Sequence, residues 1–72
     1  MHIYEVRPRK DRRGFDLISE ALPFGRLWYQ KASAATGYAK FYSRAKPGVV
    51  HIFDAAGEII AAESWPGDFR ER

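Results

Sequence analysis

The sequence contains no cysteine, which excludes disulfide bonds, thiolate nucleophiles and cysteine-ligated zinc or iron–sulfur sites. It also lacks any apolar run approaching the roughly 18 residues that a membrane-spanning helix requires. Secretory signals typically contain an apolar stretch of about 7–15 residues, and the N-terminal segment has no such stretch. From these absences we expect a cytoplasmic protein with no membrane partner.

Sequence motifs for catalysis and for metal or cofactor binding are missing as well. The six glycines are scattered, so there is no glycine-rich phosphate loop, and no serine stands in a G-x-S-x-G context. His2 and His51 have no further ligand two or four residues along the chain, and Asp54, three residues after His51, lies across a strand end, whereas a zinc site needs several convergent ligands. We therefore expect no enzymatic activity, no metal, no cofactor and no small-molecule substrate.

The chain does contain the apolar residues that a packed core needs. Its 72 residues are 46% hydrophobic and 15% aromatic, which is typical of a folded domain rather than of a disordered segment. At this length we expect a single domain. Its predicted extent is residues 1–66, and a polar C-terminal tail follows at residues 67–72.

Alternating β-forming residues and turn signals predict five strands. These strands cover residues 2–6, 15–21, 26–29, 49–54 and 58–65. Tyr4 and Val6 lie two residues apart and should share the buried face of the first strand. Asp54 and Gly57 occupy the first and fourth positions of a predicted type I turn, so the last two strands should form a hairpin.

A helix is predicted for residues 33–45, with Ser33 as its N-cap and the Lys-Pro-Gly segment 46–48 as its stop. Gly37 lies within the predicted helix and costs it about 1 kcal/mol relative to alanine. We attribute the use of glycine at this position to close contact between the helix and the sheet. At about 100° per residue, one arc should face the sheet. This arc comprises Ala34, Ala35, Tyr38, Ala39, Phe41, Tyr42 and Ala45.

The predicted element order is β-β-(β)-α-β-β, in which the bracketed third strand is short. This order defines an α+β fold, a single two-layer domain with a mostly antiparallel sheet and one amphipathic helix. The helix would cover one face of the sheet.

The chain resembles a class of small, uncharacterised bacterial domains with strand–strand–helix–strand–strand order. The shared marks are a Gly14-Phe15 opening of the second strand, an alanine-rich helix introduced by Ser33, and a final hairpin of the pattern V-x-I-x-D-x-x-G-x-I. In this sequence the pattern falls at Val50, Ile52, Asp54, Gly57 and Ile59. The resemblance covers most of residues 2–64 and implies a fold, with no established activity.

The net charge of +3 is concentrated in the first half of the chain, where residues 7–14 read R-P-R-K-D-R-R-G. Lysine and arginine neutralise phosphates, and aromatic side chains beside arginine can stack on bases. We therefore consider a nucleic-acid-binding accessory protein. Its binding residues would be Arg7, Arg9, Lys10, Arg12, Arg13, Arg26, Lys40 and Arg44.

The predicted return strand, residues 58–65, is largely apolar on both faces, which is more apolar surface than one helix covers. Short antiparallel strands also leave sheet edges that pair with other strands. Our main expectation is therefore a small, non-enzymatic binding or interaction module that pairs with a protein partner or forms a homodimer through a sheet edge or face. Nucleic-acid binding is the alternative.

Overall fold

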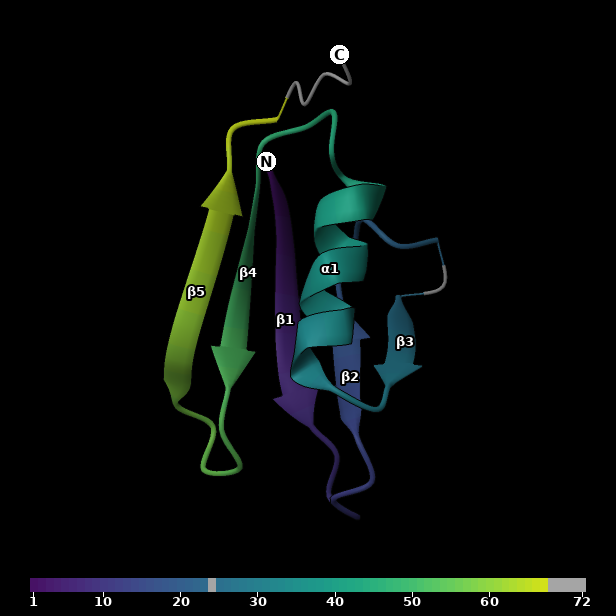
Figure 1. Ribbon diagram of the computed structural model, residues 1–72, viewed down its shortest axis with the longest axis vertical. Coiled ribbons are helices and arrows are strands. Elements are labelled where there is room, and N and C mark those ends of the chain that lie inside the picture. The colour runs from purple at the N-terminus through teal and green to yellow at the C-terminus, as the bar shows by residue number, and fades with distance from the viewer. Residues whose placement is uncertain (24, 68–72) are drawn as a thin grey trace.

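One five-stranded sheet and one helix form the two layers of the protein (Figure 1). The computed structural model describes residues 1–23 and 25–67. The elements are β1 (His2–Pro8), β2 (Phe15–Ile18), β3 (Arg26–Tyr29), α1 (Ala32–Tyr42), β4 (Gly48–Phe53) and β5 (Ile59–Trp65). The α+β class and the predicted order of elements, including the short third strand, are confirmed.

The strands lie in the order β3-β2-β1-β4-β5, so the first strand of the chain is the central strand of the sheet. β1 pairs antiparallel with β2 and parallel with β4. The outer pairs, β2–β3 and β4–β5, are antiparallel. The sheet is therefore mostly antiparallel, as expected, with one parallel pair that local sequence patterns do not predict.

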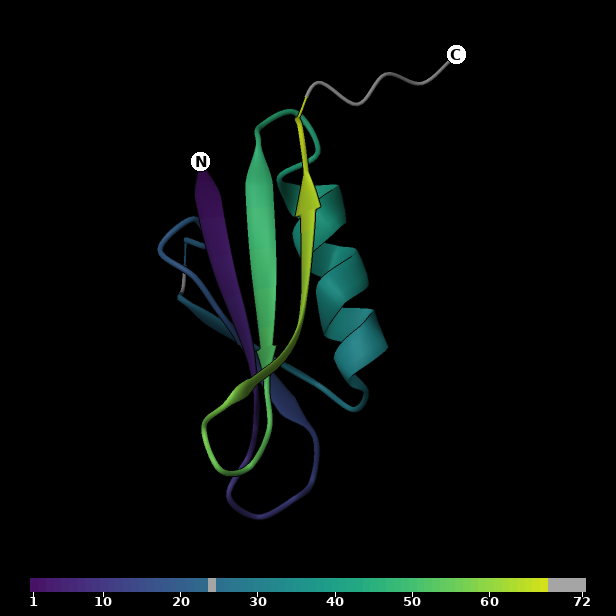
Figure 2. The same ribbon diagram turned by 90° about the vertical axis from the view of Figure 1, so that its left-hand side faces the viewer.

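The core lies between α1 and one face of the sheet (Figure 2). Tyr4 and Val6 are fully buried there, which confirms that they share the covered face of β1. Leu17 of β2 is also fully buried in this core. Ala35 and Ala39 form the underside of α1, and their small side chains let the helix approach the sheet closely.

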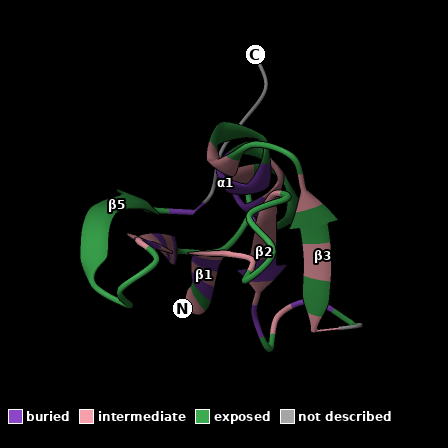
Figure 3. Cartoon of the chain, turned by 90° about the horizontal axis from the view of Figure 1, so that it is seen from below, coloured by how far each residue is buried: buried purple, intermediate pink, exposed green. Residues whose placement is uncertain are grey.

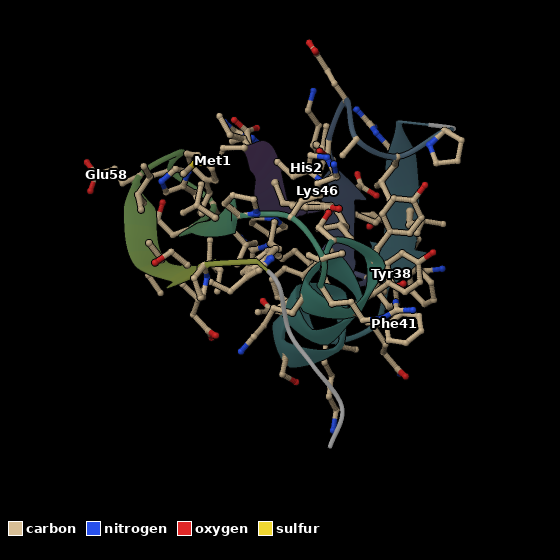
Figure 4. The ribbon with its side chains drawn as sticks, turned by 90° about the horizontal axis from the view of Figure 1, so that it is seen from above. Met1, His2, Tyr38, Phe41, Lys46 and Glu58 are labelled. Carbon is tan, nitrogen blue, oxygen red and sulfur yellow. The ribbon has the colours of Figure 1, made fainter. Side chains whose placement is uncertain are left out.

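The predicted buried side of the helix is partly wrong. Phe41 is 61% exposed and Ala34 is exposed, whereas Thr36 is buried. Helix α1 is turned so that its small side chains contact the sheet. Its aromatic side chains project toward β3 (Figure 4), where the Tyr38 ring lies 6.0 Å from the Tyr29 ring. A helix packed closely on a sheet favours small residues in the contact, and the larger rings then lie beside it.

Several predicted boundaries also shift. The helix starts after Lys31, which caps it without a side-chain hydrogen bond, so Ser33 is not the N-cap. The helix ends at Tyr42, three residues before the predicted end. Strand β2 ends at Ile18 because the Ser19 hydroxyl donates to the Ile3 carbonyl (2.6 Å) and turns the chain. Most of the predicted tail, residues 68–72, lies outside the described residues.

The predicted hairpin between β4 and β5 is confirmed. The Gly57 amide donates to the Asp54 carbonyl at 3.0 Å, and Gly57 has a φ of +86°. The Asp54 carboxylate accepts from the amides of Ala56 and Glu58, each at 2.9 Å. Asp54 therefore fixes the turn with its side chain as well as its backbone.

Ser43, which follows α1, joins the helix to the sheet. It is 1% exposed. Its hydroxyl lies 2.5 Å from the His2 Nδ1 and is hydrogen-bonded to the Tyr4 hydroxyl, and its carbonyl accepts from the Trp65 indole at 3.0 Å. These bonds link the C-terminal end of α1 to the first and last strands.

We expect Ser43→Ala to lower the free energy of unfolding by about 1–3 kcal/mol, because the buried Tyr4 hydroxyl would lose its partner. Urea denaturation followed by circular dichroism measures this change. Ser64→Ala, at an exposed position of β5, is the control and should change the free energy by no more than about 0.5 kcal/mol. Equal effects of the two substitutions would contradict the linking role of Ser43.

Gly37 does not mark a close contact between helix and sheet, so that prediction is wrong. The residue is exposed, and a Cβ atom added to it would meet nothing within 4 Å.

We expect Gly37→Ala to raise the free energy of unfolding by up to about 1 kcal/mol, because alanine is the better helix former. Gly48→Ala is the opposite case, since its Cβ would collide with the Trp65 ring, and should destabilise the fold in the same denaturation assay.

Candidate functional site

The face of the sheet opposite α1 is the open face, which no helix of the described ranges 1–23 and 25–67 covers (Figure 2). Side chains that alternate with the buried Val6 and Leu17 point to it. The strand registers align these side chains in two rows across β1, β2 and β3. The rows are Arg7–Asp16–Trp28 and Glu5–Ile18–Arg26.

Most of the predicted nucleic-acid-binding residues gather at one end of the open face. A recess of about 420 Å³ is lined by Arg7, Arg9, Lys10 and Arg26, together with acidic residues. An adjoining recess of about 300 Å³ is lined in part by Arg9 and Arg13. We call the combined region the basic corner. It comprises the charged and aromatic residues of the two recesses, Arg7, Arg9, Lys10, Asp11, Arg13, Asp16, Arg26 and Trp28, together with Arg12 of the same exposed loop.

Asp16 organises the basic corner from its centre. Its side chain is 13% exposed, and its two oxygens lie 2.9 Å from Arg9 Nη1 and 3.5 Å from Arg26 Nη1. A guanidinium group carries several N–H donors, so each arginine retains donors for a further anion. The Asp16 carboxylate therefore positions two arginines without using all their hydrogen-bonding capacity.

Arg7 is positioned by a different pair of contacts. Its guanidinium lies over the Phe53 ring, 3.8 Å from the ring centre, and its Nε lies 2.9 Å from Glu5 Oε1. Stacking and ion pairing on an exposed surface each contribute at most about 1 kcal/mol, but together they fix the direction of the side chain.

Trp28 lies beside the loop that carries the remaining cations. Its indole is 52% exposed, and its N–H donates to the Arg13 carbonyl at 2.9 Å. Gly14 permits this approach, since it has a φ of +125° and an added Cβ would lie 2.6 Å from the indole nitrogen. The sequence places Trp28 and Tyr29 beside Arg26, where an exposed aromatic ring could stack on a base, although the predicted binding residues include neither ring. The alternation of Trp28 with the half-buried Leu27 and Tyr29 identifies it as the exposed one.

Lys40 and Arg44 do not join the basic corner. The Lys40 ammonium lies 3.1 Å from Glu63 Oε1, on the side of the sheet that α1 covers. The Arg44 guanidinium lies over the Phe41 ring and donates to the Phe41 carbonyl at 2.8 Å. The predicted basic surface is thus divided between the two layers of the protein.

A second candidate site is the outer edge of β5. Every residue of this seven-residue strand is exposed except Trp65, as the green strand in Figure 3 shows. Ile59 and Ile60 are 55% and 63% exposed. Helix α1 packs over β1 to β4 and reaches β5 through the Lys40–Glu63 ion pair, so the six residues before Trp65 remain exposed.

The contact between Ser43 and His2 resembles part of a catalytic arrangement, but its burial argues for a structural role. A nucleophile must reach its substrate, whereas the Ser43 side chain is almost fully enclosed and is shared with Tyr4. Burial raises the pKa of Tyr4, although the hydrogen bond to Ser43 acts in the opposite direction. The Tyr4 phenol is therefore neutral and serves as a hydrogen-bonding group.

Metal ligands are not clustered in the part of the chain that the structure describes, where no three His, Asp or Glu side chains come together. None of the helices in that part is long and apolar enough to span a membrane. No family model, curated protein or solved structure matches the chain. Among the described residues, the basic corner and the outer edge of β5 are the two surfaces that could bind a partner.

We expect Gly14→Ala to move Trp28 out of its contact with the loop, because the new Cβ would collide with the indole and with the Tyr29 carbonyl. The measurement is the indole N–H signal of Trp28 in a proton–nitrogen NMR spectrum, which should shift markedly. The Trp65 indole signal is an internal control for the intact core. An unchanged Trp28 signal would contradict the tight approach at Gly14.

Proposed function

We propose that the protein is a small, non-enzymatic interaction module that forms a homodimer through the outer edge of β5. The observation that carries this proposal is the exposure of six consecutive residues along a seven-residue edge strand. An edge strand presents a row of backbone N–H and C=O groups, which pair readily with another strand.

β5 lacks the proline and the basic residues that often protect an edge strand, although a β-bulge interrupts its pairing with β4 between Ile52 and Phe53. Its sequence, IIAAESW, contains no proline, lysine or arginine. Its single charged residue, Glu63, pairs with Lys40. The opposite edge of the sheet, β3, is only four residues long and begins with Arg26, so it is the weaker candidate.

A second copy is the partner that fits this edge because the strand is complementary to itself. Two β5 strands related by a two-fold axis perpendicular to the sheet would run antiparallel and form one continuous ten-stranded sheet. The axis cannot pass through Glu63, since two like charges would then lie directly opposite each other. Ala61 and Ala62 are small and uncharged, and the axis is best placed at one of them.

We expect the mass in solution to rise from monomer to dimer as protein concentration increases, as measured by sedimentation equilibrium. The variant Ala61→Lys/Ala62→Lys should remain monomeric, because it places like charges opposite each other at the axis. The control variant, Ala55→Lys/Ala56→Lys, changes two exposed alanines of the β4–β5 turn and should dimerise normally.

A monomer at all concentrations would refute the homodimer. The variant Ile3→Lys, on the open face of β1, tests the other arrangement. If it abolishes the dimer while the double lysine variant of β5 does not, the two copies pair through their open faces and the edge proposal is wrong.

The cysteine-free sequence permits a direct test of the axis. Of Ala61→Cys and Ala62→Cys, the variant at the axis should form an intermolecular disulfide under mild oxidation, since residues directly opposite in neighbouring strands have Cβ atoms about 5 Å apart. Ala56→Cys, in the turn, should not cross-link at the same concentration.

A further inference from the structure

The excess of positive over negative charge is concentrated in one region of the protein. The basic corner with the adjacent Glu5 contains six cationic and three acidic side chains, and the remaining sequence contains six of each sign. The whole net charge of +3 therefore belongs to one end of the open face. A local excess of this kind attracts polyanions, whereas evenly distributed charge does not.

The basic corner also contains an exposed aromatic ring held in a fixed orientation. Gly14 allows the Trp28 indole to lie against the loop, and the hydrogen bond to the Arg13 carbonyl holds it there. Trp28 stands two residues from Arg26 on the same face of β3 and beside Asp16 on β2. The ring therefore adjoins the recess in which the arginines converge.

We propose that the basic corner binds single-stranded nucleic acid, with one base stacked on Trp28 and the neighbouring phosphates bound by the surrounding cations. Stacking on an aromatic platform combined with a cationic track along the backbone is the general mode of single-strand binding. Arg9 and Arg26, which Asp16 positions, would contact phosphates beside the stacked base. Lys10, Arg12 and Arg13 on the exposed loop would extend the track.

A single strand fits this surface better than a duplex does. The faces of paired bases are occupied by their neighbours in a duplex, so they are not open to stacking on Trp28. A duplex is generally read by a helix or a strand ribbon that enters its major groove. Helix α1 cannot assist at the basic corner because it covers the opposite face of the sheet (Figure 2).

The binding experiment uses fluorescence anisotropy with a labelled oligothymidylate of about ten nucleotides, titrated with the full-length protein at about 50 mM salt. If about three phosphates are neutralised, raising the salt to about 200 mM should weaken binding roughly 20-fold. Absence of binding at about 50 mM salt would overturn the proposal. A duplex of the same length that binds as tightly would overturn the assignment to single strands.

Charge-matched variants locate the site. The variant Lys10→Ser/Arg12→Ser/Arg13→Ser should lose most of the affinity and of the salt dependence. The control variant Lys40→Ser/Arg44→Ser/Lys46→Ser removes the same charge from exposed or half-buried positions outside the basic corner and should lose much less. Equal losses in the two variants would show a response to overall charge and would refute a localised site.

An aromatic pair tests the stacking contact. Trp28→Leu should weaken binding of the oligothymidylate at least about fivefold, because one stacked base is lost. Phe41→Leu, at a similarly exposed ring on α1, should leave the affinity unchanged. If Trp28→Leu retains full affinity while circular dichroism shows an intact fold, the proposed stacking is wrong.

Discussion

A single helix covers a five-stranded sheet, and this mismatch in width determines most of the surface of the protein. A helix is about 10 Å across, whereas five strands spaced about 4.8 Å apart span roughly 20 Å. Helix α1 contacts β1 to β4, and the fully buried side chains of the sheet come from β1, β2 and β4. No helix or strand of the described residues 1–23 and 25–67 consequently covers the other face of the sheet or the outer edge of β5. The two proposed interfaces occupy these two uncovered regions.

The two uncovered regions differ in chemistry because different side chains alternate out of the core. On β1 and β2, the positions that alternate with buried residues include Glu5, Arg7 and Asp16, and Asp16 draws two arginines together there. On β5, four of the six exposed residues are isoleucine or alanine, and the only charged residue, Glu63, is already paired. An uncharged edge suits backbone pairing with a like strand, and a charged face with one aromatic ring suits a polyanion. The two surfaces are on separate strands, so occupation of one does not require the other.

Local sequence patterns predicted the parts of the fold that depend on neighbouring residues. The alternation of Tyr4 and Val6 identified the buried face of β1, and the spacing of Asp54 and Gly57 identified the hairpin turn. The rotation of α1 was missed because hydrophobicity alone places Phe41 inward, whereas close packing on the sheet favours Ala35 and Ala39.

The candidate sites show the same division between local and long-range information. Charge counting identified the loop of the basic corner, which is continuous in sequence. It also grouped Lys40 with the loop, although Lys40 lies on the side of the sheet that the helix covers. Which face a helical residue occupies depends on how the helix packs, and that contact involves residues distant in the sequence.

The parallel pairing of β1 with β4 affects how the chain reaches its folded state. Its partners are far apart, since His2 pairs with Gly48, about 46 positions further along the chain. The β2–β3 and β4–β5 pairs join neighbouring segments and close quickly, whereas β1 completes the sheet only when the later half of the chain arrives. During synthesis β1 is therefore made before β4 and remains without this second neighbouring strand until β4 has been made. We therefore expect closure of this long loop, rather than formation of the helix or the hairpins, to limit the rate of folding.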